Sequence, residues 1–216
     1  MFLLYQKKDK VYPESVKIGG DWFFINAGFK NILRIFDMLD DENIPEVKKI
    51  CKLREWFFVD DLPEGVSSEV MAEAFVGFLT TPPAGTPPRR GMGVGTGETG
   101  RTGETGERER QFCYNFDAGE IYAGFLSEYD IDLIEADLHW YKFRILLENL
   151  SPESAFKRKI ELRFMDLNDY SGRKFAELAE AKEAVQLPER GMKSYEKSQE
   201  LQEVEEFNEI WGKAGS

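Results

Sequence analysis

The chain has a single histidine, His139, and it lies among residues that could do acid–base chemistry. Glu135 precedes it by four residues and Lys142 follows it by three, a spacing that brings side chains together on one face of a helix. A carboxylate beside an imidazole can transfer protons. No nucleophile is placed to complete a catalytic group, however, and the chain has no G-x-S-x-G sequence. We therefore interpret His139 as a structural or partner-contacting residue, with a catalytic base as the alternative.

Two further motifs could hold a ligand. Residues 95–100, "GTGETG", match the G-x-G-x-x-G pattern of dinucleotide-binding loops, but proline and arginine precede them where that fold needs a strand. Residues 129–137, "YDIDLIEAD", are rich in carboxylates, but they lack the central glycine and the final glutamate of a calcium loop. A linker explains the first motif more simply, and helix capping by Asp132 with Glu135 explains the second. The sequence predicts no catalytic, metal-binding or cofactor-binding residues.

Composition and charge restrict the class of protein. The 216 residues carry a formal charge of −12, which disfavours binding to nucleic acids, and 42% of them are apolar, enough for a folded core. The two cysteines have no zinc-site spacing and fit a reducing compartment. The start of the chain, "MFLLYQKKDK", lacks the order of a signal peptide, and no stretch approaches the roughly 20 apolar residues of a membrane span. We expect a soluble protein of the cytoplasm.

Residues 15–26, "SVKIGGDWFFIN", predict a β-hairpin. Val16 and Ile18 alternate with polar residues, and the Gly19–Gly20 pair supplies the positive φ angles that a tight hairpin turn needs. A lone hairpin is marginally stable in water, so this one should pack against helices.

Apolar residues at intervals of three and four predict seven or so helices in the rest of the ordered chain. One of them is expected to cover residues 134–150, because Ala136, Trp140, Phe143 and Leu147 share a face. The expected helix-starting residues are Asn26, Pro45, Ser67 or Ser68, Asp117 with Glu120 as a capping box, and Ser151 followed by Pro152.

Two segments differ from the helical parts. Residues 81–111 consist mostly of glycine, proline, threonine and charged residues, which cannot offset the entropy of ordering and predict a flexible linker or insertion. Residues 194–211 place Leu201, Val204, Phe207 and Trp211 on one side of an amphipathic helix. That helix either joins the core or docks on a partner or a second copy of the chain. Its glutamates argue against binding to an anionic membrane.

The predicted fold is therefore mainly α, a helical bundle with an N-terminal β-hairpin and a disordered Gly/Pro-rich insertion. Its expected parts are residues 1–80 with the hairpin and helices, the insertion 81–111, a helical bundle over 112–188, and a C-terminal amphipathic extension over 189–216.

Several stretches together resemble a known family. They are "YPESVKIGGDWFFINAGF", "YNFDAGEIYAGFLSEYDIDL", "LHWYKFRILLENLS", "FMDL" and "LPE", and together they span residues 12–188. In this order they are similar to the "gene product fifteen" family of siphophages and related prophages, in which the "LHWxKFR" core is the most distinctive motif. Tyr141 stands where the family tends to have tryptophan, and Asp130 where it tends to have glycine. Residues 189–216 extend past the usual end of the family.

The resemblance implies a role in tail morphogenesis. Family members are commonly encoded between tail-tube and tape-measure genes, a position associated with tail assembly chaperones. It thus implies a non-enzymatic chaperone that binds the tape-measure protein, tail-tube subunits or both, in the cytoplasm of the bacterial host. Self-association is a further expectation, from the amphipathic residues 194–211. A structural tail component retained in the virion is the alternative, and a small enzyme using Glu135 and His139 is a third hypothesis. The partner-binding residues that we would choose are His139, Trp140, Phe143, Phe207 and Trp211.

Overall fold

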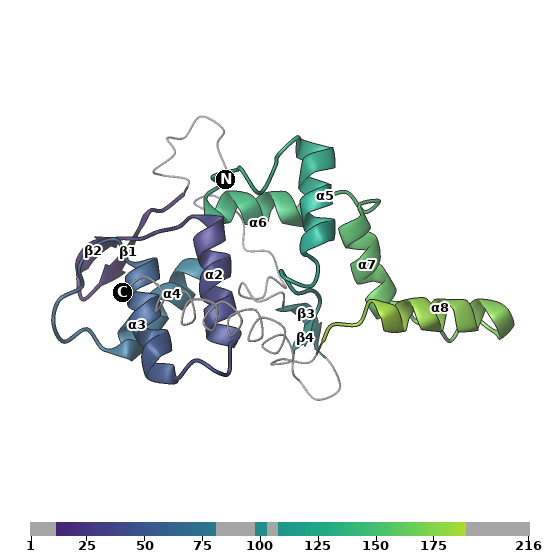
Figure 1. Cartoon of the computed structure of the whole chain (residues 1–216), viewed down its shortest axis with the longest axis horizontal. Helices are drawn as coiled ribbons and strands as arrows, with labels where there is room; N and C mark the ends of the chain where they lie inside the picture. The colour runs from purple at the N-terminus through teal and green to yellow at the C-terminus, as the bar shows by residue number, and fades with distance from the viewer. Residues whose placement is uncertain (1–11, 81–97, 103–107, 189–216) are drawn as a thin grey trace, which may run out of the picture.

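The structure is a computed structural model, and it describes residues 12–80, 98–102 and 108–188. These residues form seven helices and two short antiparallel ladders, which confirms the mainly α prediction (Figure 1). The helices are α2 (Phe29–Asp40), α3 (Glu46–Phe57), α4 (Ser68–Thr80), α5 (Ala118–Tyr129), α6 (Trp140–Glu148), α7 (Ala155–Phe164) and α8 (Gly172–Ala184). The strands are β1 (Ser15–Ile18), β2 (Asp21–Phe24), β3 (Glu98–Thr102) and β4 (Arg108–Arg110).

The predicted N-terminal hairpin is present, with β1 and β2 joined by a two-residue turn. Gly19 and Gly20 have φ angles of 60° and 112°, values that glycine adopts without the steric cost other residues meet. Val16 and Ile18 point inward and are buried. The β1 strand contacts α4, so the helices supply the packing that a lone hairpin lacks.

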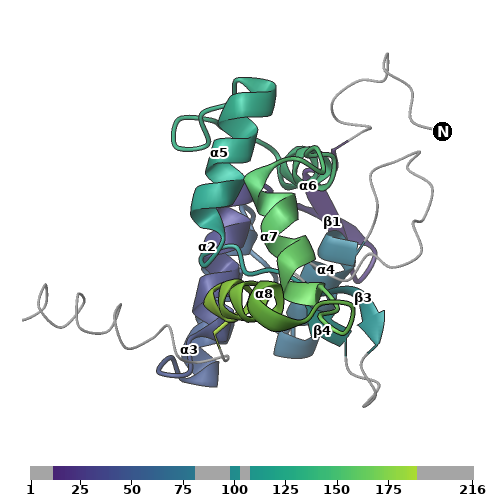
Figure 2. The ribbon, with the colours of Figure 1, turned by 90° about the vertical axis from the view of Figure 1, so that its right-hand side faces the viewer.

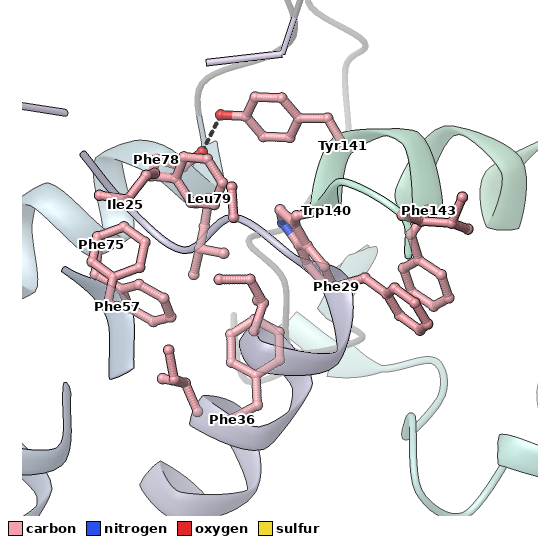
Figure 3. Packing of buried hydrophobic residues seen from close by; sticks show 14 of the residues in the cluster. Ile25, Phe29, Phe36, Phe57, Phe75, Phe78, Leu79, Trp140, Tyr141 and Phe143 are labelled. Atoms are coloured by element: carbon pink, nitrogen blue, oxygen red, sulfur yellow. Dashed lines mark hydrogen bonds between the residues drawn. The ribbon is translucent and has the colours of Figure 1, made fainter. Parts of the chain in front are cut away.

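One apolar core runs through both halves of the chain (Figures 1 and 3). On the N-terminal side, α3 packs against α2 and α4; on the C-terminal side, α5 packs against α6 and α7. Contact between α2 and α6 joins the two sides. The regions predicted as 1–80 and 112–188 therefore share one buried interior and do not each have their own.

Helix α8 lies at the edge of this arrangement. It contacts α7, carries no fully buried residue and extends away from the other helices; Figure 2 looks along its axis. The hairpin β1–β2 lies at the opposite end of the molecule in Figure 1.

Several predicted helix starts are displaced by one to three residues. Helix α2 starts after Gly28, not Asn26, and Pro45 is the residue before α3 and not its first helical position. Helix α7 is capped by Ser154, whose hydroxyl accepts a hydrogen bond from the Lys157 N–H at 3.2 Å, and Ser151 does not cap it. The Ser67 cap of α4 is confirmed by a 3.4 Å hydrogen bond from the Val70 N–H.

Most of the predicted insertion, residues 81–97 and 103–107, and the C-terminal extension 189–216 lie outside the described residues. Of the remaining residues of the insertion, all but Gln111 form the antiparallel ladder of β3 and β4, whose register is irregular between Glu98 and Thr102. The sequence analysis did not predict these strands. Pairing of this kind uses backbone groups, so the apolar alternation that identifies most strands from sequence is not required for it.

A buried ion cluster joins α5 to α7. Asp117 is fully buried, and both of its carboxylate oxygens accept hydrogen bonds from the Arg163 guanidinium, at 2.5 and 2.9 Å. Lys159 lies 3.0 Å from the same carboxylate. Asp117 therefore does not form the predicted capping box, because its side chain makes no cap hydrogen bond within α5 and pairs with these two cations.

The cluster holds Asp117 in its charged form. Burial on its own would raise the pKa of Asp117. This effect is outweighed by hydrogen bonds from the Arg163 guanidinium, the Cys113 backbone N–H and the Lys159 ammonium, so the pKa lies below its ordinary value. An aspartate in the unfolded chain has a pKa of about 3.9. The carboxylate therefore contributes stability that is fully present above about pH 4 and is lost as the pH falls toward its folded-state pKa.

We expect Asp117→Asn to lower the free energy of unfolding at pH 7 by about 3–5 kcal/mol, because it leaves the buried Arg163 without its counterion. Denaturant unfolding of the two proteins at pH 7 and pH 3 measures this difference, which should shrink at pH 3. Glu120→Gln is the matched control: Glu120 is partly exposed and bonds only Lys159 in this cluster, so its loss should cost about 1 kcal/mol or less. Equal stability of Asp117→Asn and the wild type at pH 7 would contradict a stabilising role for the cluster.

Candidate functional site

Helix α6 begins at Trp140, six residues later than the predicted start at residue 134. Helix α5 ends because Asp130 adopts the left-handed conformation, with φ of 54°, which explains why glycine suits this position. The following loop is folded by Asp132, whose carboxylate accepts a hydrogen bond from the Ile134 N–H at 2.8 Å. Glu135 and His139 are therefore not on one helix face, and the spacing that suggested acid–base chemistry has no helical basis.

His139 is the N-cap residue of α6. Its Nδ1 accepts a hydrogen bond from the Tyr141 N–H at 3.1 Å, and its Nε2 lies 3.1 Å from the Pro13 carbonyl oxygen. The neutral imidazole with its proton on Nε2 satisfies both contacts, as assigned from these partners. The ring also stacks on Tyr12, with centroids 5.1 Å apart. Both ring nitrogens are thus engaged in holding the start of α6 and the segment before β1.

A backbone bridge ties the start of α6 to the start of α2. The Trp140 N–H donates to the Ala27 carbonyl at 2.7 Å, and the Phe29 N–H donates to the Leu138 carbonyl at 2.9 Å. The first N–H groups of a helix have no partner within the helix. Here the residue before each cap, Ala27 or Leu138, supplies the carbonyl that accepts from the first N–H of the other helix.

Helix α6 also completes the C-terminal end of α4. The Tyr141 hydroxyl donates a hydrogen bond to the Phe78 carbonyl (Figure 3), and the Arg144 guanidinium donates to the Leu79 carbonyl at 2.8 Å. Burial raises the pKa of Tyr141, which keeps this hydroxyl protonated as a donor. Two of the last carbonyls of α4 are in this way satisfied by α6.

The structure places the predicted partner-binding residues Trp140 and Phe143 inside the chain's own core. Their exposed fractions are 0% and 1%, and Figure 3 shows them among the rings of the buried cluster. Phe143 stacks on Phe29 with centroids 4.8 Å apart. In this fold they offer no surface to another protein, because the apolar face of α6 is covered by α2 and α5. The predicted residues Phe207 and Trp211 lie outside the described residues.

The hairpin exposes an apolar surface that the sequence analysis did not select. Trp22 is 67% exposed, Phe24 60% and Val59 67%. Val59 belongs to the segment after α3, which lies beside β2: its N–H donates to the Phe24 carbonyl at 2.9 Å, and the next pair, Ile25 with Phe58, is buried. Phe24 and Val59 therefore lie on the opposite side from the core, together with Trp22. We call these three residues the outer hairpin face.

The sequence did contain a signal for this surface. In a hairpin with a two-residue turn at Gly19–Gly20, Trp22 pairs with Lys17, and directly paired residues share one face of the ladder. Successive side chains of a strand point to opposite faces, and Lys17 lies between the apolar residues Val16 and Ile18. The sequence therefore predicted that Lys17 points outward and that its partner Trp22 points outward as well.

Two further observations concern other kinds of site. Among the residues that the structure describes, no three or more histidine, cysteine, aspartate or glutamate side chains are grouped so that they could hold a metal ion. None of the helices in the described ranges combines the length and the apolar character needed to cross a membrane.

The comparisons with known proteins identify a family. No curated protein and no solved structure matches the chain significantly. The family described as bacteriophage Gp15 protein matches residues 8–187, most of the chain's 216 residues. This range contains the hairpin, the L-H-W-x-K-F-R segment that begins α6, and every described helix. The chain belongs to the bacteriophage Gp15 protein family.

Proposed function

We propose that this member of the family is a non-enzymatic tail assembly chaperone that binds the tape-measure protein in the cytoplasm of the bacterial host. The outer hairpin face is the observation that carries the proposal. Two aromatic side chains of the hairpin and a valine of the segment beside it, all at least 60% exposed, lie together on the side opposite to the buried Val16, Ile18 and Ile25. Exposed aromatic residues gathered in one place are typical of surfaces that bind another polypeptide.

The charge of the chain supports the same role. A long apolar partner tends to aggregate until it is assembled, and a strongly acidic companion keeps a complex soluble through charge repulsion. This chain carries a formal charge of −12 over 216 residues. The exposed aromatic surface and the net negative charge together support one function best: covering an apolar segment of a partner while keeping the complex soluble.

The contacts of His139 support a non-enzymatic role. Nδ1 accepts from the Tyr141 N–H as the cap of α6, and Nε2 contacts the Pro13 carbonyl. A general base needs a nitrogen directed at a substrate. Here the two nitrogens contact backbone groups of the chain itself.

Co-expression with the tape-measure protein from the same phage tests the chaperone role. We expect the soluble fraction of the tape-measure protein to rise several-fold when this chain is present, because its apolar segments are covered, and the two proteins to co-purify. Co-expression with an unrelated acidic protein of similar size controls for a general effect of charge. Unchanged solubility together with no co-purification would contradict the proposal.

The alternative is a structural component retained in the virion, and the presence of the chain in finished particles separates the two roles. A chaperone leaves the finished tail, so we expect mass spectrometry of purified virions to find this chain far below the amount of the tail-tube protein. A constant, stoichiometric amount in the virion would favour the structural role.

Substitution of His139 tests the enzyme hypothesis. We expect His139→Ala to lower the free energy of unfolding by about 1–2 kcal/mol through loss of the cap, and His139→Asn to retain most of it, because asparagine is itself a good N-cap residue. Thermal unfolding measures this. The Asn variant should solubilise the tape-measure protein as the wild type does; a stably folded Asn variant that no longer supports phage assembly would point to a chemical role for the imidazole.

A further inference from the structure

We propose that residues 194–211 fold back as a helix antiparallel to α8 and cover the side of α8 that carries Phe175. This contact is independent of the chaperone role. Three observations carry it: the lack of burial along α8, the place where the described chain ends, and the match in size and charge between the residues of the two segments.

Helix α8 lacks the packing that a helix of its length needs. None of its 13 residues is buried, and its partly buried Leu178 does not pack against the core. A helix this short is marginally stable in water without a packed face. Five residues of α8 follow the i, i+3, i+4, i+7, i+11 spacing of one helix side: Gly172, Phe175, Ala176, Ala179 and Glu183. Phe175 is 44% exposed, and the others except Ala179 are exposed as well, so we call this the open side of α8.

The described chain ends beside the inner end of α8. The Arg163 Nε donates to the Val185 carbonyl at 2.5 Å, and the Arg110 guanidinium donates to the Pro188 carbonyl at 2.6 Å. These contacts hold the residues after α8 against α7 and β4. Since α8 extends away from the other helices, its C-terminal end is the inner end and its start is the outer end (Figure 1).

This anchoring sets the direction of any helix that follows. Only residues 189–193 separate Pro188 from the amphipathic segment 194–211, so the segment begins close to the inner end of α8. A helix that starts there and follows α8 runs outward, antiparallel to it. A helix rises about 1.5 Å per residue, so residues 194–211 are long enough to follow all 13 residues of α8.

The side chains of the two segments match in size in this direction. Four residues of each share the i, i+4, i+7, i+11 spacing: Gly172, Ala176, Ala179 and Glu183 in α8, and Lys197, Leu201, Val204 and Asn208 in the segment. In antiparallel order, Leu201 lies opposite Ala179. Val204 likewise lies opposite Ala176. A large side chain against a small one fills the space between two helices, and the apolar residues that follow come beside the exposed Phe175.

The charges match in the same register. Lys197 lies opposite Glu183 at the inner end, and at the outer end Glu205 comes beside Arg173. Arg173 bonds Glu177 of its own helix at 2.8 Å, and both side chains are largely exposed, so the arginine remains accessible to a second carboxylate. A parallel arrangement would separate both pairs. The charges therefore favour the direction that the anchored end of α8 also requires.

Hydrogen exchange of the full-length chain, followed by mass spectrometry, tests the contact. We expect the α8 amides to exchange at least about tenfold faster in Leu201→Asp than in the wild type, because a carboxylate opposite Ala179 breaks the contact and α8 then opens more often. The α6 amides should exchange equally in both proteins, since the core holds α6. Gln202→Asp is the matched control: it adds the same charge at the next position, away from α8, and should leave the α8 rates within about twofold.

A double-mutant cycle tests the register. Glu183→Lys and Lys197→Glu each break the proposed ion pair, and the double variant restores it with the charges exchanged. We expect the α8 amides of the double variant to exchange roughly two- to fivefold more slowly than the two single changes together predict, the effect of one exposed ion pair. Each charge also acts on its own helix end, and the cycle removes that contribution.

Each other outcome overturns the proposal in a different way. Equal α8 exchange in the wild type, Leu201→Asp and Gln202→Asp shows that the segment does not cover α8. Faster exchange of α3 in Leu201→Asp, with α8 unchanged, places the segment elsewhere on the chain. Additive effects in the double-mutant cycle exclude the register. Protection of α8 that falls on dilution, with a dimer in sedimentation, identifies the segment of a second copy as the occupant.

Discussion

The backbone bridge between residues 27–29 and 138–140 is the constraint on which the rest of the structure depends. Two helices that are more than a hundred residues apart in the sequence begin at this bridge, and the segment leading into each one accepts a hydrogen bond from the first N–H of the other. Once the two starts are fixed together, α6 contacts α2, and Trp140 and Phe143 are directed into the interior. The two halves of the chain are thus held by direct contact, and their association does not depend on the path of residues 81–111 between them.

This constraint also explains the distinctive L-H-W-x-K-F-R segment. Leu138 supplies a carbonyl to α2, His139 caps α6, Trp140 and Phe143 fill the core, and Arg144 satisfies a carbonyl at the end of α4. Lys142 is the exposed position. Tyr141 donates a hydrogen bond from its hydroxyl, and tryptophan, which the family tends to have here, also carries one donor on a large flat ring. The segment is distinctive because nearly every residue in it has a structural partner, and this is why it resembled an active site when only its residue types were known.

The sequence predicted the elements that depend on local patterns and missed those that depend on distant partners. Period-two and helical spacing, with the Gly19–Gly20 turn, correctly identified the hairpin and the helices because these patterns are repeated within each element. The start of α6 was placed too early because Asp130 ends α5 in a left-handed conformation that residue type alone does not indicate. Asp117 was taken for a cap because Arg163, the partner that claims its carboxylate, lies 46 residues away. Trp140 and Phe143, which were predicted to bind a partner, are buried in the core. A helical pattern identifies the apolar face of a helix but does not show whether the chain itself or another protein covers that face.

The distribution of aromatic residues supports recognition at the hairpin. The large side chains of α6, Trp140, Tyr141, Phe143 and Leu147, are buried in the core, so the motif that identifies the family has little surface left for a partner. Trp22 and Phe24 differ, because burial of their strand neighbours Val16, Ile18 and Ile25 already secures the hairpin without them. Exposed aromatic side chains that lie together on an ordered strand are typical of a surface that another polypeptide covers. Phe175 on α8 is exposed too, but α8 buries no residue of its own and presents it on a helix that a single neighbour supports. The ordered hairpin therefore provides the better platform for binding another polypeptide.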